Sequence, residues 1–157
     1  MPGDVLLIGI AQLAIVMAGF TGISATLMPA GSTWSGSQRI RFGIIVSVSF
    51  NVMFESLLPV VAFPALNDQR AAIVLASALV AIYLVVIVGI RAREAAGAQA
   101  VRATSTLLIL TAAIGSIVLF GLNAALFGSL TVYALALCVQ LAVAVISFYS
   151  LITTASR

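Results

Sequence analysis

The chain contains no histidine and no lysine, and its single cysteine is Cys138. Without histidine, haem and zinc sites that need imidazole ligands are excluded, and so is catalysis by a histidine base. One cysteine cannot form a disulfide within the chain. Paired carboxylates and glycine-rich phosphate loops are also absent from the sequence. We therefore expect a protein that is not an enzyme and that holds no metal and no cofactor.

Charged residues are scarce as well. Only 7% of the 157 residues are charged and 63% are hydrophobic, whereas soluble domains carry about 25% charged residues. A soluble fold of this size could not bury so much apolar surface. The net charge of +3 is spread over several loops, which gives no basic patch for nucleic acid. The lipid bilayer is therefore the expected partner and solvent.

Five apolar segments predict an all-α, polytopic membrane protein that forms one transmembrane domain over residues 1–157. The expected helices run from about residue 5 to 28, 42 to 66, 71 to 90, 104 to 122 and 130 to 152. Continuous runs of this length are typical of spanning helices, and the alternating pattern of a membrane barrel is absent. A polar turn at Asn67–Arg70 separates the second helix from the third. An uncharged turn at Asn123–Ser129 separates the last two.

The arginines predict the orientation of this bundle. With five spans, Arg70 alone lies on one side, and the other side holds Arg39, Arg41, Arg91, Arg93, Arg102 and Arg157. Positive residues collect in the cytoplasm, so we expect the N-terminus outside and the C-terminus in the cytoplasm. The use of arginine alone, with abundant alanine, valine and leucine, favours a bacterial protein of the cell (inner or plasma) membrane.

Glu55 is the most informative residue, because it lies near the middle of the second apolar segment. It is the only charged residue expected deep in the hydrocarbon. A carboxylate at the bilayer centre costs at least about 2.5–3.5 kcal/mol on insertion scales. A polar partner, water, an ion or a proton must offset that cost. We expect the carboxyl group to carry a proton while the site is dry and to ionise when water or a cation enters.

A polar stripe surrounds Glu55. Ser47, Asn51, Glu55 and Pro59 follow one another at every fourth position, which places them along one face of a helix. Pro59 disturbs the carbonyl of Glu55, four residues earlier, and Pro64 does the same to Val60. We therefore predict an ion- or proton-binding site made by Glu55, Asn51 and Ser47, in a helix kinked at Pro59 and Pro64.

No lysine or arginine lies in the apolar segments to pair with Glu55. Neutral side chains on the other helices are the candidate partners, and the sequence does not choose among them. They are Gln12, Thr21, Tyr83, Thr111, Ser116, Gln140 and Ser147.

Two further patterns concern packing and anchoring. Ala14, Ala18 and Gly22 recur at every fourth position in the first segment. Such rows of small residues let helices approach closely, within one chain or between subunits. Trp34 is expected as an anchor at the membrane interface, and Tyr133 as a second anchor at the outer face.

These features predict an oligomeric membrane channel or transporter for a monovalent cation or a proton, with Glu55 as the mid-membrane site. Five helices leave little room for a private pore, which favours a homo-oligomer. The alternative is a non-catalytic membrane subunit that packs in a larger complex. In that case Glu55 is a polar clasp between helices.

Overall fold

The computed structural model describes residues 3–26, 36–97 and 103–155, and these residues are almost entirely helical, with no strand among them. The elements in chain order are α1 (Asp4–Thr26), α2 (Gly36–Leu66), α3 (Gln69–Gly97), α4 (Ala103–Leu122), a short π-helix η1 (Asn123–Phe127) and α5 (Leu130–Ala155). The predicted all-helical class is confirmed.

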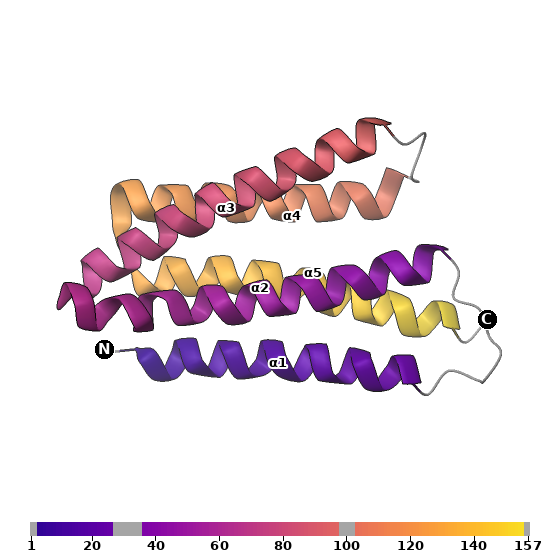
Figure 1. Ribbon diagram of the computed structural model, residues 1–157, viewed down its shortest axis with the longest axis horizontal. Helices are drawn as coiled ribbons and strands as arrows, with labels where there is room; N and C mark the ends of the chain where they lie inside the picture. Colours follow the sequence, from indigo (N-terminus) through magenta and orange to yellow (C-terminus); the bar gives the residue numbers. More distant parts are fainter. Residues whose placement is uncertain (1–2, 27–35, 98–102, 156–157) are drawn as a thin grey trace.

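The helices run up and down along one long axis (Figure 1). α2 packs against α1, α3 and α5, while α4 packs against α3 and α5. α1 begins at one end of the bundle and α5 ends at the other (Figure 1). α2 and α5 thus form the centre of the molecule, and any polar group on their facing sides is enclosed by other helices.

Four described helices are long and apolar enough to cross a membrane. Their apolar stretches are Asp4–Ile23, Arg41–Leu66, Gln69–Ile90 and Leu130–Thr153, and Thr111–Phe127 is a shorter apolar stretch. About 20 residues suffice to cross the hydrocarbon core. Large apolar side chains such as Val5, Val61 and Ile82 also cover the outer surface. Helices that are apolar on every side are typical of membrane spans, so these features indicate a multi-pass membrane protein.

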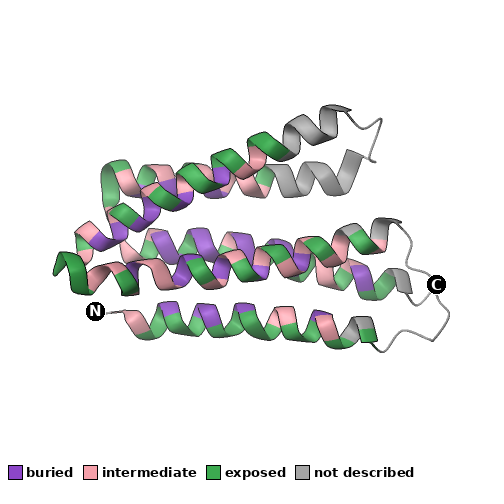
Figure 2. Cartoon of the chain, viewed as in Figure 1, coloured by how far each residue is buried: buried purple, intermediate pink, exposed green. Residues whose placement is uncertain are grey.

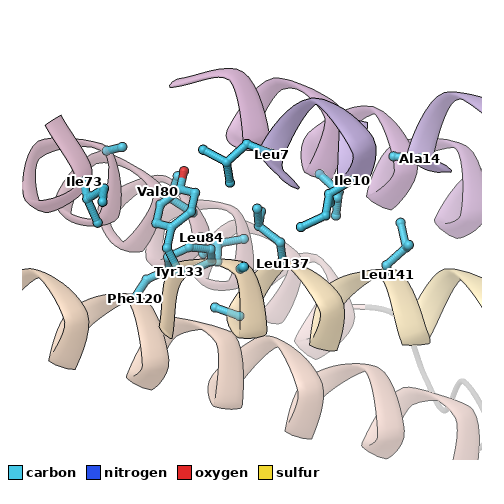
Figure 3. Packing of buried hydrophobic residues seen from close by; sticks show 14 residues of the cluster. Leu7, Ile10, Ala14, Ile73, Val80, Leu84, Phe120, Tyr133, Leu137 and Leu141 are labelled. Atoms are coloured by element: carbon cyan, nitrogen blue, oxygen red, sulfur yellow. The ribbon is translucent and has the colours of Figure 1, made fainter. Parts of the chain in front are cut away.

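The core lies along the inner faces of the helices (Figures 2 and 3). Its residues recur at spacings of three or four, which is the repeat of one helix face. They include Leu7, Ile10 and Ala14 on α1, Ile73, Val80 and Leu84 on α3, Phe120 on α4, and Tyr133, Leu137 and Leu141 on α5.

The turn between α2 and α3 comprises two polar residues. Asn67 adopts a left-handed conformation with φ 50°, and its N–H donates to the carbonyl of Phe63 at 2.8 Å. The Asp68 carboxylate then accepts from the backbone N–H of Arg70 at 2.8 Å and of Ala71 at 3.4 Å. Asparagine tolerates the left-handed conformation, and aspartate is a favoured N-cap. Because of this cap, α3 begins two residues earlier than expected.

The break between α4 and α5 is shorter than predicted. Residues expected in the turn from Asn123 onward instead continue the helix as η1, and only Gly128 and Ser129 lie outside helices. Gly128 has φ 57°, and its N–H donates to the carbonyl of Asn123 at 2.7 Å. The side chain of Asn123 makes two further hydrogen bonds, both at 2.9 Å. Its Oδ1 accepts from the backbone N–H of Ser129, and its Nδ2 donates to Ser77 Oγ. Asn123, itself a helical residue, therefore binds the two backbone N–H groups that follow the helix.

Other helix ends also differ from the expected positions. α2 begins at Gly36, ahead of the expected residue 42. α3 runs beyond Ile90 to Gly97, and α5 runs beyond residue 152 to Ala155. The end of an apolar run marks where the hydrocarbon ends. A helix can continue past that point, because its backbone hydrogen bonds are internal and do not require apolar side chains.

Candidate functional site

Glu55 lies close to the middle of the apolar part of α2, which runs from Arg41 to Leu66. Its side chain is 4% exposed. It therefore faces the other helices and not the outer surface of the bundle. A carboxyl group at this depth has to find its polar partners within the protein.

The partner of the Glu55 carboxyl group is on α5. Gln140 Nε2 donates to Glu55 Oε2 at 2.7 Å, and Gln140 is itself buried. Glu55 Oε1 is also buried, but it has no hydrogen-bond partner among the described residues. One carboxyl oxygen is thus held in place, and the other remains unpaired in an apolar interior.

The backbone of Glu55 is held by a second residue of α5. Pro59 has no N–H, so the carbonyl of Glu55 lacks its usual helical donor. The hydroxyl of Tyr133 donates to this carbonyl at 2.6 Å. The Tyr133 ring packs edge-on against Phe120 of α4, with ring centroids 5.1 Å apart. Tyr133 therefore compensates for the missing hydrogen bond and links three helices.

A cavity of about 330 Å³ lies beside Glu55 between α2 and α3. Its walls are mostly apolar. They consist of Asn51, Phe54, Glu55 and Leu58 from α2 and Leu79, Val80 and Tyr83 from α3. The hydroxyl of Tyr83 donates to Asn51 Oδ1 at 3.0 Å across this cavity. Glu55 and this polar pair thus line one cavity, which could admit water or a small ligand.

The predicted stripe is only partly assembled into this site. Asn51, Glu55 and the buried Pro59 are close to it, but Ser47 is exposed and does not line the cavity. Positions four apart rotate by about 40° around a helix of 3.6 residues per turn. Over the eight residues from Ser47 to Glu55, this rotation carries the stripe from the outer surface into the bundle. The structure therefore does not bring Ser47 together with Asn51 and Glu55.

Pro64 is exposed near the end of α2, away from the cavity lining, and α2 continues through both prolines. Only Pro59 is therefore coupled to the carboxyl site, through the carbonyl that Tyr133 binds.

Two of the seven candidate partners are at the site. Gln140 binds the carboxyl group and Tyr83 lines the cavity. Gln12 and Thr111 are exposed, and the Thr21 hydroxyl donates to the carbonyl of Met17 in its own helix at 2.8 Å. Ser116 is buried with an unpaired hydroxyl, and Ser147 is half-buried; neither lines the cavity.

Tyr133 is the site residue that the sequence analysis assigned wrongly. Expected as an anchor at the interface, it is fully buried against Glu55 and Phe120. Its place near the start of an apolar segment is also that of an interfacial aromatic residue. Pro59 is the sequence signal that could have indicated the buried role of Tyr133, because it leaves the carbonyl of Glu55 without a hydrogen-bond donor.

The row of small residues on α1 is partly in the core. Ala14 is fully buried, whereas Ala18 and Gly22 are half-buried. A Cβ atom added to Gly22 would meet nothing within 4 Å. Close packing within the chain therefore accounts for Ala14 but does not require glycine at position 22. Trp34, the predicted anchor, lies outside the described residues.

The arrangement can hold a proton on a carboxyl group or present that group to a positive ligand. The described residues contain no cluster of three or more histidine, cysteine, aspartate or glutamate side chains that could hold a metal ion. Comparisons with protein-family models, with curated proteins and with solved structures found no match to this chain.

Proposed function

We propose that the protein is an oligomeric membrane channel or transporter for a monovalent cation or a proton, with Glu55 as its mid-membrane site. The supporting observation is the unpartnered Oε1 atom of a carboxyl group buried at the middle of an apolar helix. A buried polar atom without a partner costs about 1–3 kcal/mol, and a charged one costs more. Unlike the unpaired hydroxyls of Ser49 and Ser116, this oxygen belongs to an ionisable group that lines a cavity, and a site that binds and releases a positive species needs such a free oxygen.

The oxygen atoms near Glu55 favour a proton over a metal ion. Hard cations such as Ca²⁺ and Mg²⁺ take about six to eight oxygen ligands. Here Glu55 Oε2 already accepts from Gln140, and Asn51 Oδ1 accepts from Tyr83. A dehydrated Ca²⁺ or Mg²⁺ ion would therefore find too few ligands, whereas a proton needs only the free carboxyl oxygen. Glu55 would release the proton when water enters the cavity and take it up when the site is dry.

The proposed setting is a bacterial inner membrane, crossed five times, with the N-terminus outside and the C-terminus in the cytoplasm. Arg41, near the start of α2, and Arg70, near the start of α3, lie at opposite ends of the bundle. The excess of arginine on the side of Arg41 supports this orientation. Five helices leave little room for a private pore, so water would reach the site along an interface between copies of the chain.

Proton flux tests this proposal. The purified protein is placed in vesicles that contain a pH-sensitive dye, and a potassium diffusion potential drives proton uptake. We expect the wild type to acidify the vesicles. The rate should be at least about tenfold lower in Glu55→Gln, because a positioned proton-transfer group contributes typically 10²–10⁴-fold. Glu94→Gln is the matched control. It removes the only other glutamate, which lies beyond the apolar part of α3, and should keep the rate.

The second candidate is a non-catalytic subunit in which Glu55 is a clasp between helices. It is favoured by the bonds from Gln140 and Tyr133, which tie α2 to α5 at both the side chain and the backbone of Glu55. A clasp predicts no flux above that of protein-free vesicles and a Glu55→Gln variant that is merely less stable. It also predicts a monomer in detergent, whereas the channel or transporter should remain a homo-oligomer.

A further inference from the structure

The cavity beside Glu55 opens to the side of the bundle, since the exposed residues of its lining lie about halfway along α2 and α3. Phe54 is 62% exposed, Leu79 50% and Tyr83 41%, and all three line the cavity. Leu79 and Tyr83 lie near the middle of the apolar stretch Gln69–Ile90, and Phe54 lies near the middle of Arg41–Leu66. At this depth the surroundings of a membrane-spanning helix are lipid chains. A ligand that uses this opening therefore arrives from the bilayer and needs an apolar part that can lie among the lipid chains.

The residues that line the cavity indicate which kind of ligand would fit. Leu58, Leu79 and Val80 supply apolar surface, and the rings of Phe54 and Tyr83 lie at the opening. A volume of about 330 Å³ is at the small end of the range of ligand pockets, about 300–1,000 Å³. Aromatic faces attract organic cations, above all ammonium groups. The unpaired Glu55 oxygen supplies the one negative charge that such a cation requires.

We propose that this cavity binds a small lipophilic organic cation, a protonated or quaternary amine, which enters from the bilayer and pairs with the Glu55 carboxylate. An ammonium group whose hydrogens are largely replaced by alkyl groups is weakly hydrated and does not need the shell of oxygen ligands that a metal ion needs, so the few polar groups here suffice. The inference rests on the proposed function, since the cation takes the place of the proton on the same carboxyl group.

The exchange balances in charge. The neutral acid loses its proton to water, the carboxylate pairs with the incoming cation, and the site stays neutral in both states. The ionisable groups facing this region are few. α3 contributes Tyr83 to the cavity, and α5 contributes Tyr133, whose hydroxyl binds the Glu55 backbone. α1 has no ionisable side chain after Asp4, and between Arg41 and Leu66 α2 has none besides Glu55. Proton and cation therefore compete for one carboxyl group.

Binding is measured by calorimetry on the protein in lipid nanodiscs with benzyltrimethylammonium, which carries one aromatic ring and a permanent charge. Neopentylbenzene has the same shape without the charge and is the control ligand. We expect the cation to bind, to release up to one proton per site into a weakly buffered solution, and to bind about tenfold more weakly per unit decrease in pH wherever Glu55 is protonated. Equal binding of neopentylbenzene would overturn the proposal.

Variants locate the bound cation. Glu55→Gln should weaken binding at least tenfold, and Phe54→Leu about fivefold through the lost ring. Leu79→Trp should block the opening without touching the carboxyl group. Leu135→Trp is its matched control, because Leu135 is equally exposed but lies on α5 away from the cavity lining. Unchanged binding in both Glu55→Gln and Leu79→Trp would place the cation elsewhere and end the proposal.

The two proposals fail in different ways. If no cation binds, but proton flux without any organic cation still depends on Glu55, the ligand inference is wrong and the proposed function stands. If a cation binds through Glu55 and no proton flux is found, the cavity is a binding site in a protein that does not conduct protons. If neither binding nor flux depends on Glu55, both proposals are wrong.

Discussion

At the scale of single residues, the site depends on how α5 satisfies two separate groups of Glu55. Gln140 binds the carboxyl group, and Tyr133 binds the carbonyl that Pro59 deprives of a donor. In hydrocarbon no water is available to replace either bond. Hydrogen bonds therefore hold the backbone carbonyl and Oε2 of Glu55 in place, and Oε1 remains free to bind a proton or a cation.

Tyr133→Phe tests the backbone half of this arrangement. The ring would still pack on Phe120, but the Glu55 carbonyl would lose its donor. We expect the free energy of unfolding in mixed micelles to fall by about 1–3 kcal/mol, the cost of an unsatisfied buried acceptor. Tyr149→Phe is the control. Tyr149 is 71% exposed, and its variant should stay within about 0.5 kcal/mol of the wild type.

The sequence identified Glu55, Asn51 and Pro59 as one group because helical spacing relates residues within a segment. It could not choose Gln140 among seven polar candidates. The helices are apolar on every side, so the pattern of apolar residues does not tell which face of α5 meets α2. The bond between Tyr133 and Glu55 joins residues 78 positions apart, and single-chain periodicity contains no information on such pairs.

At the scale of elements, α2 continues through Pro59, and the hydrogen bond lost within the helix there is replaced from α5. The sequence predicted where the helices lie from the length of the apolar runs. It placed several ends wrongly, at Gly36, Gln69 and Gly97, because polar caps and polar turns of helix extend beyond the hydrocarbon. The π-helix at Asn123–Phe127 was missed because Asn123 and Gly128 are typical turn residues.

A double-mutant cycle tests whether Tyr133 compensates for Pro59. Pro59→Ala returns an N–H to position 59, which can donate to the Glu55 carbonyl within the helix. In this background the loss of the tyrosine hydroxyl should cost less than in the wild type, by about 1 kcal/mol in the free energy of unfolding. Additive effects of the two substitutions would show that the hydroxyl and the proline act independently.

At the scale of the whole molecule, the five crossings proposed above would place the two ends of the chain on opposite sides of the membrane. The first residues of α1 and the α2–α3 turn lie at one end of the bundle, with Asp4, Asp68 and Arg70. The start of α2 lies at the other end, with Arg39 and Arg41, and Arg41 donates to the carbonyl of Ser150 near the end of α5 at 2.9 Å. Two charged ends separated by apolar helices fit a protein that crosses the bilayer completely.

Cysteine labelling in intact bacterial cells checks this orientation. In a Cys138→Ser background, Gln69→Cys should react with a membrane-impermeant maleimide added from outside, since the α2–α3 turn is expected there. Ala96→Cys, near the end of α3, should react only after the cells are made permeable. The reverse pattern would invert the bundle and overturn the orientation. Labelling of both residues from outside would show that α3 does not cross, and the site around Glu55 would then lose its place in the hydrocarbon.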